Sequence, residues 1–229
     1  MTGRMLKDAR KKLGMKQVEA AAHLGVSQTY YSLLENGKRT ITDRLAKRAV
    51  KRFNLSPTVL PLNKELNRLR STTNQGLVKD LASLKYPGYS HVSPSELQNP
   101  VTVLYRALMT KDLEARLVEA LPWVLFTFSD LQWNTLVAGA KIKDLQNKLG
   151  FLNSLAKKLA EQMSDKNKFA EFERREQALE KSRLMKEDTL CYESMGEVER
   201  RWLRKNRSPD ADHWNILSDL EAKHLTYAK

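Results

Sequence analysis

Three side chains that follow Ser27 have the chemistry needed to read the edges of DNA bases. Gln28 carries an amide that can pair in a bidentate way with N6 and N7 of adenine, and Thr29 carries a methyl group that can contact the methyl of thymine. Leu33 follows one helical turn after Thr29 and can add an apolar contact on the same side. The three can act together only if a helix begins at Gln28 and presents this face outward.

Residues suited to holding a phosphate backbone surround this segment. Positive charge is concentrated nearby, because residues 1–75 hold 16 Lys/Arg and 5 Asp/Glu, a net of +11, whereas the remainder holds 24 and 22, a net of +2. An excess of this kind indicates a polyanionic partner. We expect the phosphate contacts to come from Gln17, Tyr30, Asn36, Lys38 and Arg39.

The elements that must position these side chains are readable from capping and turn residues. An Ala-rich helix is predicted from Gln17 to Leu24, where Gly25 permits the left-handed conformation that ends it. The side chain of Val26 is expected to pack into the core and so hold the turn in place. Ser27 is expected to cap a second helix over 28–35. Helices over 2–13, from a cap at Thr42 to about residue 53, and from Ser56-Pro57 complete a five-helix domain over residues 1–62.

This arrangement resembles the Xre/Cro-type helix-turn-helix of bacterial and phage repressors. The matching residues are Gln17, Ala21, Gly25, Val26, Ser27, Tyr30, Ser32, Glu35, Asn36, Gly37 and Arg39. The resemblance implies that Arg10 and Glu35 form an internal ion pair. Two residues depart from it: Lys16 stands where a capping Ser or Thr is usual, which predicts a weakly capped helix, and Ala20 replaces the usual Leu.

The rest of the chain is predicted to be helical, which makes the protein all-α. Residues 63–100 have the composition of a linker, although Ser93-Pro-Ser-Glu96 has the form of a capping box that opens a helix. Residues 101–229 are expected to form a larger helical domain with long antiparallel helices that serves dimerisation and partner binding. Apolar-rich helices are predicted at Val101–Met109 and at Leu113–Leu125, the second interrupted by Pro122.

A continuous apolar stripe runs from Ile142 to Met163 and predicts one amphipathic helix, with Gly150 as its weak point. Residues 165–190 carry a narrower stripe, which indicates either an antiparallel helix partner or a dimer seam. Trp202 and Trp214 are expected to anchor two short C-terminal helices around Ser208-Pro209.

The densest apolar run suggests either core or a surface for a partner or ligand. Its aromatic residues are Trp123, Phe126, Phe128 and Trp133. The sequence contains no Gly-rich phosphate loop, nucleophile elbow or metal-ligand spacing, so we expect no enzyme, no metal and no cofactor. Cys191 is the only cysteine and is expected to be a small, half-buried structural residue. The lack of a signal segment or a membrane-spanning run predicts a cytoplasmic, nucleoid-associated protein.

Three functions fit these features. The resemblance implies a repressor that binds a near-palindromic operator in double-stranded DNA as a homodimer and that acts as the autoregulating antitoxin of a toxin–antitoxin pair. The first alternative is a ligand-sensing or phage-type repressor without a toxin partner. The second alternative is an enzyme with a DNA-targeting module.

Overall fold

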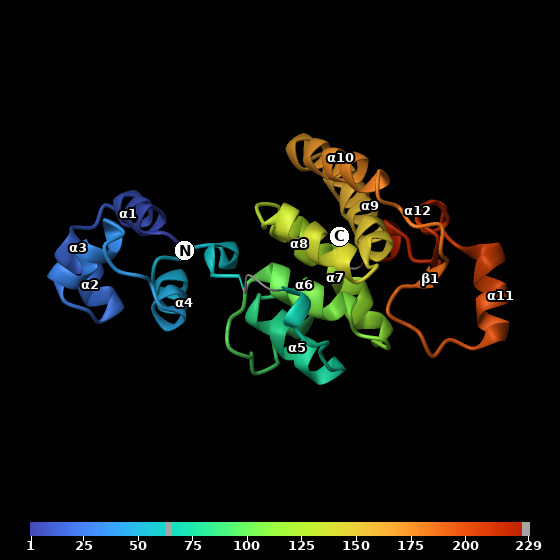
Figure 1. Ribbon diagram of the computed structural model, residues 1–229, viewed down its shortest axis with the longest axis horizontal. Coiled ribbons are helices and arrows are strands. Elements are labelled where there is room, and N and C mark those ends of the chain that lie inside the picture. The colour runs from blue at the N-terminus through green and yellow to red at the C-terminus, as the bar shows by residue number, and fades with distance from the viewer. Residues whose placement is uncertain (63–65, 226–229) are drawn as a thin grey trace. The chain divides into compact units, whose positions relative to one another are not determined.

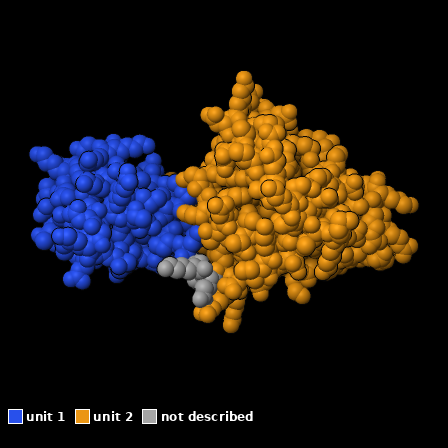
Figure 2. Space-filling model, turned by 45° about the horizontal axis from the view of Figure 1, so that its top comes forward, with its two compact units in different colours: residues 1–63, 97–99 blue, residues 64–96, 100–229 orange. Residues whose placement is uncertain are grey.

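The computed structural model describes residues 1–62 and 66–225. These residues form twelve α-helices, four short 3-10 turns and two strands of two residues each (Figure 1). The chain divides into two compact units, one of residues 1–63 and 97–99, the other of residues 64–96 and 100–229 (Figure 2). The prediction of an all-α protein with a small N-terminal helical domain and a larger helical region is confirmed.

The first unit follows the capping pattern of its sequence. Its helices are α1 (Gly3–Lys12), α2 (Gln17–Leu24), α3 (Gln28–Glu35) and α4 (Asp43–Arg52), followed by a 3-10 turn at Pro57–Val59. The Thr42 hydroxyl accepts a hydrogen bond from the Leu45 N–H and so begins α4. The fifth predicted helix is only this 3-10 turn.

The start of α2 is better capped than the sequence predicts. The carboxylate of Glu19 accepts a hydrogen bond of 2.7 Å from the backbone N–H of Lys16, which is the half of a capping box that needs no Ser or Thr at position 16. Ala20 and Ala21 are 0% and 2% exposed. Their small side chains lie in the core of the first unit together with Tyr31 and Leu34 of α3.

The second unit is built around α9 (Gln146–Gln162), of whose 17 residues 13 are buried. Helices α7 (Ala115–Thr127), α8 (Trp133–Ile142) and α10 (Lys166–Glu180) pack against it. The remaining elements are α5 (Asn74–Ser83), α6 (Pro100–Leu108), α11 (Glu197–Asn206), α12 (Pro209–His213) and the parallel strands β1 (Asp188–Thr189) and β2 (Ile216–Leu217). Helix α7 continues through Pro122 without a break.

The predicted apolar stripe from Ile142 to Met163 is divided between two helices. Helix α8 ends at Ile142, and Asp144 has a φ of 56°, in the left-handed region that ends a helix. Ile142 is 64% exposed and Met163 is 55% exposed, so neither belongs to the buried face. The contacts of α10 with α9 use the narrow stripe of 165–190 inside the unit, which agrees with an antiparallel helix partner rather than a dimer seam.

The segment expected as a linker contains ordered structure that packs within the second unit. Helix α5 buries Leu77 and Leu81 completely. No helix begins at Ser93, because the hydroxyl of Ser95 donates a hydrogen bond of 2.6 Å to Asp80 of α5, and the Ser95 N–H bonds to the carbonyl of Lys79. The capping-box interpretation of Ser93–Glu96 is therefore wrong, and the next helix begins at Pro100.

The C-terminal tryptophans differ in burial. Trp214 is fully buried, as expected of an anchor, whereas Trp202 on α11 is 53% exposed and is not a buried anchor. Cys191 is fully buried rather than half-buried, and its thiol lies 3.5 Å from the carbonyl of Ala107. Burial raises the pKa of the Cys191 thiol to about 12, which keeps the thiol protonated and unreactive.

Gly150, the predicted weak point of its helix, makes room for Trp214. A Cβ at position 150 would lie 2.5 Å from Cε3 of Trp214, closer than two carbon atoms can pack. The indole N–H of Trp214 donates a hydrogen bond of 2.9 Å to Ser154, one turn further along α9. The glycine therefore contributes to stability through packing, although it costs helix propensity.

Replacing Gly150 with alanine should destabilise the second unit by roughly 1–3 kcal/mol, because overpacking outweighs the gain of about 1 kcal/mol in helix propensity. Chemical denaturation followed by tryptophan fluorescence measures this. Gly196 is the control, because a Cβ there meets open space. A Gly150→Ala protein that is as stable as the wild type would contradict the packing argument.

Candidate nucleic-acid interface

The turn between α2 and α3 fixes the direction in which α3 leaves the core. Gly25 has φ 63° and ψ 43°, the left-handed conformation that its residue type adopts without strain. Val26 packs partly buried against the core of the first unit. The hydroxyl of Ser27 accepts a hydrogen bond of 3.2 Å from the N–H of Tyr30, which caps the start of α3.

A chain of hydrogen bonds connects the core of the first unit to the start of α3. Arg10 donates to the two carboxylate oxygens of Glu35 at 2.7 and 3.2 Å. Gln17 donates its amide to the same carboxylate at 2.8 Å. The carbonyl oxygen of that amide accepts a hydrogen bond of 3.1 Å from the side-chain amide of Gln28. Through Gln17, the buried ion pair therefore orients Gln28.

This chain gives Gln17 a structural task in addition to the phosphate contact expected of it, which stays a prediction. One N–H of its amide donates to Glu35, the amide oxygen accepts from Gln28, and the side chain is half-buried. No sequence signal distinguishes the two tasks, because residues 17 and 28 are brought together only by the crossing of α2 and α3. We regard Gln17 as a positioning residue for Gln28.

The Glu35 carboxylate is held in its charged form. Burial by itself raises the pKa of Glu35, but the hydrogen bonds from Arg10 and Gln17 outweigh burial, so the pKa lies below its usual range. The side chain of Glu35 is 1% exposed. The hydrogen bond from Arg10 to Glu35 raises the pKa of the Arg10 guanidinium. A buried carboxylate of this kind is stable only while its partners remain in place.

The N-terminal turn of α3 presents two of the three candidate base-reading residues to solvent. Gln28 and Thr29 are exposed. Leu33 is half-buried and lies outside the core cluster of the first unit. These side chains are free to meet a groove that α3 enters, except that Gln28 is already oriented by Gln17.

Basic and polar residues frame α3 at its C-terminal end. The amide of Asn36 donates a hydrogen bond of 2.9 Å to the carbonyl of Ser32 and closes the helix, and Gly37 follows with a φ of 69°. Lys38 and Arg39 come next in the chain and are exposed.

The sequence pattern did not single out Arg44, which lies beside the N-terminal part of α3. Arg44 and Thr42 of the α4 start line a hollow of about 270 Å³ together with Val26 and Tyr30. Tyr30 is half-buried against the core. Arg44 is exposed and adds a cation close to α3 that only the tertiary structure reveals. Its neighbour Arg48 binds the carbonyl of Leu24 and ties α4 to the end of α2.

Residues 6–60 match the protein-family model described as Helix-turn-helix. The first unit is a helix-turn-helix domain. Comparisons with curated proteins and with solved structures found no match for the chain. The helix-turn-helix domain is a DNA-binding module of transcriptional regulators, and the outward N-terminus of α3 is where such a domain meets the major groove.

The four aromatic residues considered as a partner surface belong to the second unit and lie in two groups. Trp123 makes edge-to-face contacts with Phe128, at 5.8 Å between ring centroids, and with Tyr86, at 5.1 Å. Phe126 stacks on Phe172 under the ammonium of Lys168, and the guanidinium of Arg175 lies over Trp133. Phe128 is buried, whereas Trp123, Phe126 and Trp133 are half-buried, and their role as a partner surface stays a prediction.

The part of the chain that the structure describes contains neither a metal-binding cluster nor a membrane-spanning helix. Among residues 1–62 and 66–225, no three His, Cys, Asp or Glu side chains are grouped so that they could hold a metal ion. None of the helices formed by these residues has the length and apolar character that crossing a bilayer requires.

Proposed function

We propose that the protein is a sequence-specific transcriptional repressor whose helix-turn-helix domain reads an operator half-site through Gln28, Thr29 and Leu33. The observation that supports this most is the start of α3, where Gln28 and Thr29 are exposed and the amide of Gln28 is held by Gln17. A side chain that is already oriented loses less conformational entropy on binding, which favours discrimination between bases.

In this proposal the phosphate backbone is held on both sides of α3. Lys38 and Arg39 at its C-terminal end and Arg44 at the start of α4 supply the cations, with Tyr30 and Asn36 as polar neighbours. Contacts of this type fix the register of the domain on DNA and carry no sequence information themselves. Their loss should therefore weaken binding to every sequence alike.

Replacing Lys38 and Arg39 with alanine should lower the affinity for all duplexes and reduce the slope of log K against log salt by roughly 1–2, since each lost phosphate contact removes about 0.9 from the slope. Fluorescence anisotropy over a salt series measures this. Lys51 and Arg52 provide a charge-matched control, because they are exposed in the last turn of α4, at the opposite end from Arg44. Equal slopes in the wild type and the Lys38/Arg39 variant would contradict the assignment.

We further propose that two copies bind a near-palindromic operator, because one recognition helix reads too few bases to select a site in a genome. Helix α9 is almost entirely buried within the second unit, whereas α10 buries only Phe172, Arg175 and Leu179, so the open face of α10 remains a candidate for the pairing surface. Mass measurement of the protein–operator complex should give two chains for each operator. One chain on a full-length operator would contradict this part of the proposal.

The antitoxin role extends the proposal on the strength of the family resemblance. A toxin encoded beside this gene that co-purifies with the chain would support it. A neighbouring metabolic operon would favour the alternative of a ligand-sensing repressor.

A further inference from the structure

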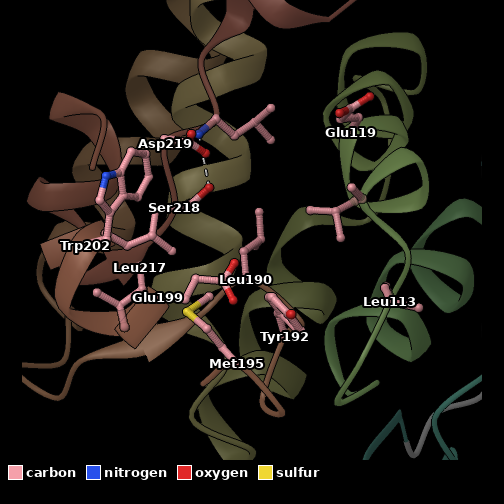
Figure 3. A pocket seen from close by; sticks show the side chains of 14 residues that line it. Leu113, Glu119, Leu190, Tyr192, Met195, Glu199, Trp202, Leu217, Ser218 and Asp219 are labelled. Carbon is pink, nitrogen blue, oxygen red and sulfur yellow. Dashed lines mark hydrogen bonds between the residues drawn. The ribbon is translucent and has the colours of Figure 1, made fainter. Parts of the chain in front are cut away.

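A cavity of about 480 Å³ lies in the second unit, between the N-terminal end of α7 and helix α11. Figure 3 shows Leu113 and Glu119 on one side, Trp202 and Leu217 on the other, and the residues after β1 below them. The volume falls in the range of roughly 300–1,000 Å³ that is usual for sites binding small organic molecules. The cavity is distinct from the aromatic groups around Trp123 and Trp133.

The cavity combines a buried apolar floor with exposed aromatic rings at its edge. Leu190, Met195 and Leu217 form the floor and are 5%, 7% and 1% exposed. Trp202 and Tyr192 line the same cavity but are 53% and 40% exposed. An apolar ligand placed here would cover both rings, which are otherwise left in water.

The charged groups of the lining all have the same sign. Glu119, Glu199 and Asp219 are carboxylates, and the described lining contains no Lys, Arg or His. This is unusual in a chain with a net charge of +13. Carboxylates beside an exposed indole favour a cation, because the carboxylates attract the charge and the ring face provides a cation–π contact.

We propose that this cavity binds a small organic cation with a bulky apolar body, such as an aromatic or quaternary ammonium compound. The apolar part of the ligand would fill the floor, and its charge would lie among the carboxylates beside Trp202. Helix α11 is joined to the rest of the unit by a small buried cluster of Met195, Leu203 and Leu217. A ligand in contact with both α7 and α11 would strengthen this attachment. The proposal does not depend on DNA binding.

Tetraphenylphosphonium and tetraphenylborate provide a direct test, because they have nearly the same shape and apolar surface but opposite charge. Titration calorimetry on the full chain should show one site for tetraphenylphosphonium and an affinity for tetraphenylborate at least about tenfold lower, a ratio that corresponds to about 1.4 kcal/mol. The net positive charge of the protein would by itself favour the borate. A preference for the phosphonium must therefore come from a local site.

The variant Glu199→Gln/Asp219→Asn should lose most of this preference, and Trp202→Ala should weaken tetraphenylphosphonium binding about tenfold. Glu161→Gln/Glu173→Gln is the control with the same change in charge, since both residues are exposed and lie outside the cavity. Hydrogen exchange of α11 should slow when the phosphonium is bound. The proposal is overturned if the wild type binds tetraphenylborate as tightly as the phosphonium, if it binds neither ion, or if the Glu199/Asp219 variant keeps the wild-type preference.

Discussion

A protein in which Gln28 and Thr29 are both alanine should still bind DNA but should no longer distinguish its operator from other sequences. Each good base contact contributes about 1–3 kcal/mol of discrimination, so losing two should reduce the ratio of specific to nonspecific affinity by roughly 30-fold or more. Phosphate contacts and the fold should persist, because both side chains are exposed and neither belongs to the core.

Footprinting on the DNA that precedes the gene, together with competition by unrelated duplex, measures this ratio. The matched control replaces Gln75 and Asn167, exposed and uncharged residues on helices of the second unit. That control should keep the wild-type footprint. If the Gln28/Thr29 variant also keeps it, the bases are read by other residues and the proposed interface is wrong.

Replacing Arg10 with alanine should destabilise the helix-turn-helix domain by about 3–5 kcal/mol, because the carboxylate of Glu35 would stay buried without its cation. The ion pair of 2.7 Å joins α1 to the end of α3, and the Glu35 side chain is 1% exposed. Denaturation followed by circular dichroism should show this domain unfolding earlier. All four tryptophans lie in the second unit, so tryptophan fluorescence serves as an internal control and should not change.

The pH dependence distinguishes a charge effect from a packing effect. In the wild type the folded-state pKa of Glu35 is lowered, so the carboxylate contributes stability above its unfolded pKa and loses it as pH falls through the folded pKa. Without Arg10, burial raises that pKa, and the charged form becomes a cost at neutral pH. The difference between wild type and Arg10→Ala should therefore shrink on acidification. A difference that stays constant with pH would mean that the guanidinium acts only by packing.

The first unit could be predicted closely because its signals are local. Gly25, Ser27 and Thr42 act on the backbone within a few residues, so their types determine where helices end and begin. The bounds of α2 and α3 agree with the sequence pattern for the same reason. The Helix-turn-helix match over residues 6–60 covers this region.

The second unit was predicted less well because its decisive contacts join distant residues. The bond from Ser95 to Asp80 replaces a predicted cap, and the turn at Asp144 divides an apolar period that looks continuous. Gly150 was expected to weaken its helix, but it provides the space into which Trp214 packs. At the candidate interface, the hydrogen bond between Gln28 and Gln17 likewise joins residues of two different helices. None of these contacts leaves a period or a motif in the sequence.

Selection from a pool of randomised duplexes by the full-length protein tests most directly whether α3 reads base sequence. The proposal predicts that bound duplexes converge on one short motif, repeated in inverted orientation about one helical turn apart, and that convergence is lost when Gln28 and Thr29 are replaced by alanine. Retention of duplexes without any shared motif, at an affinity that depends only on salt, would contradict it.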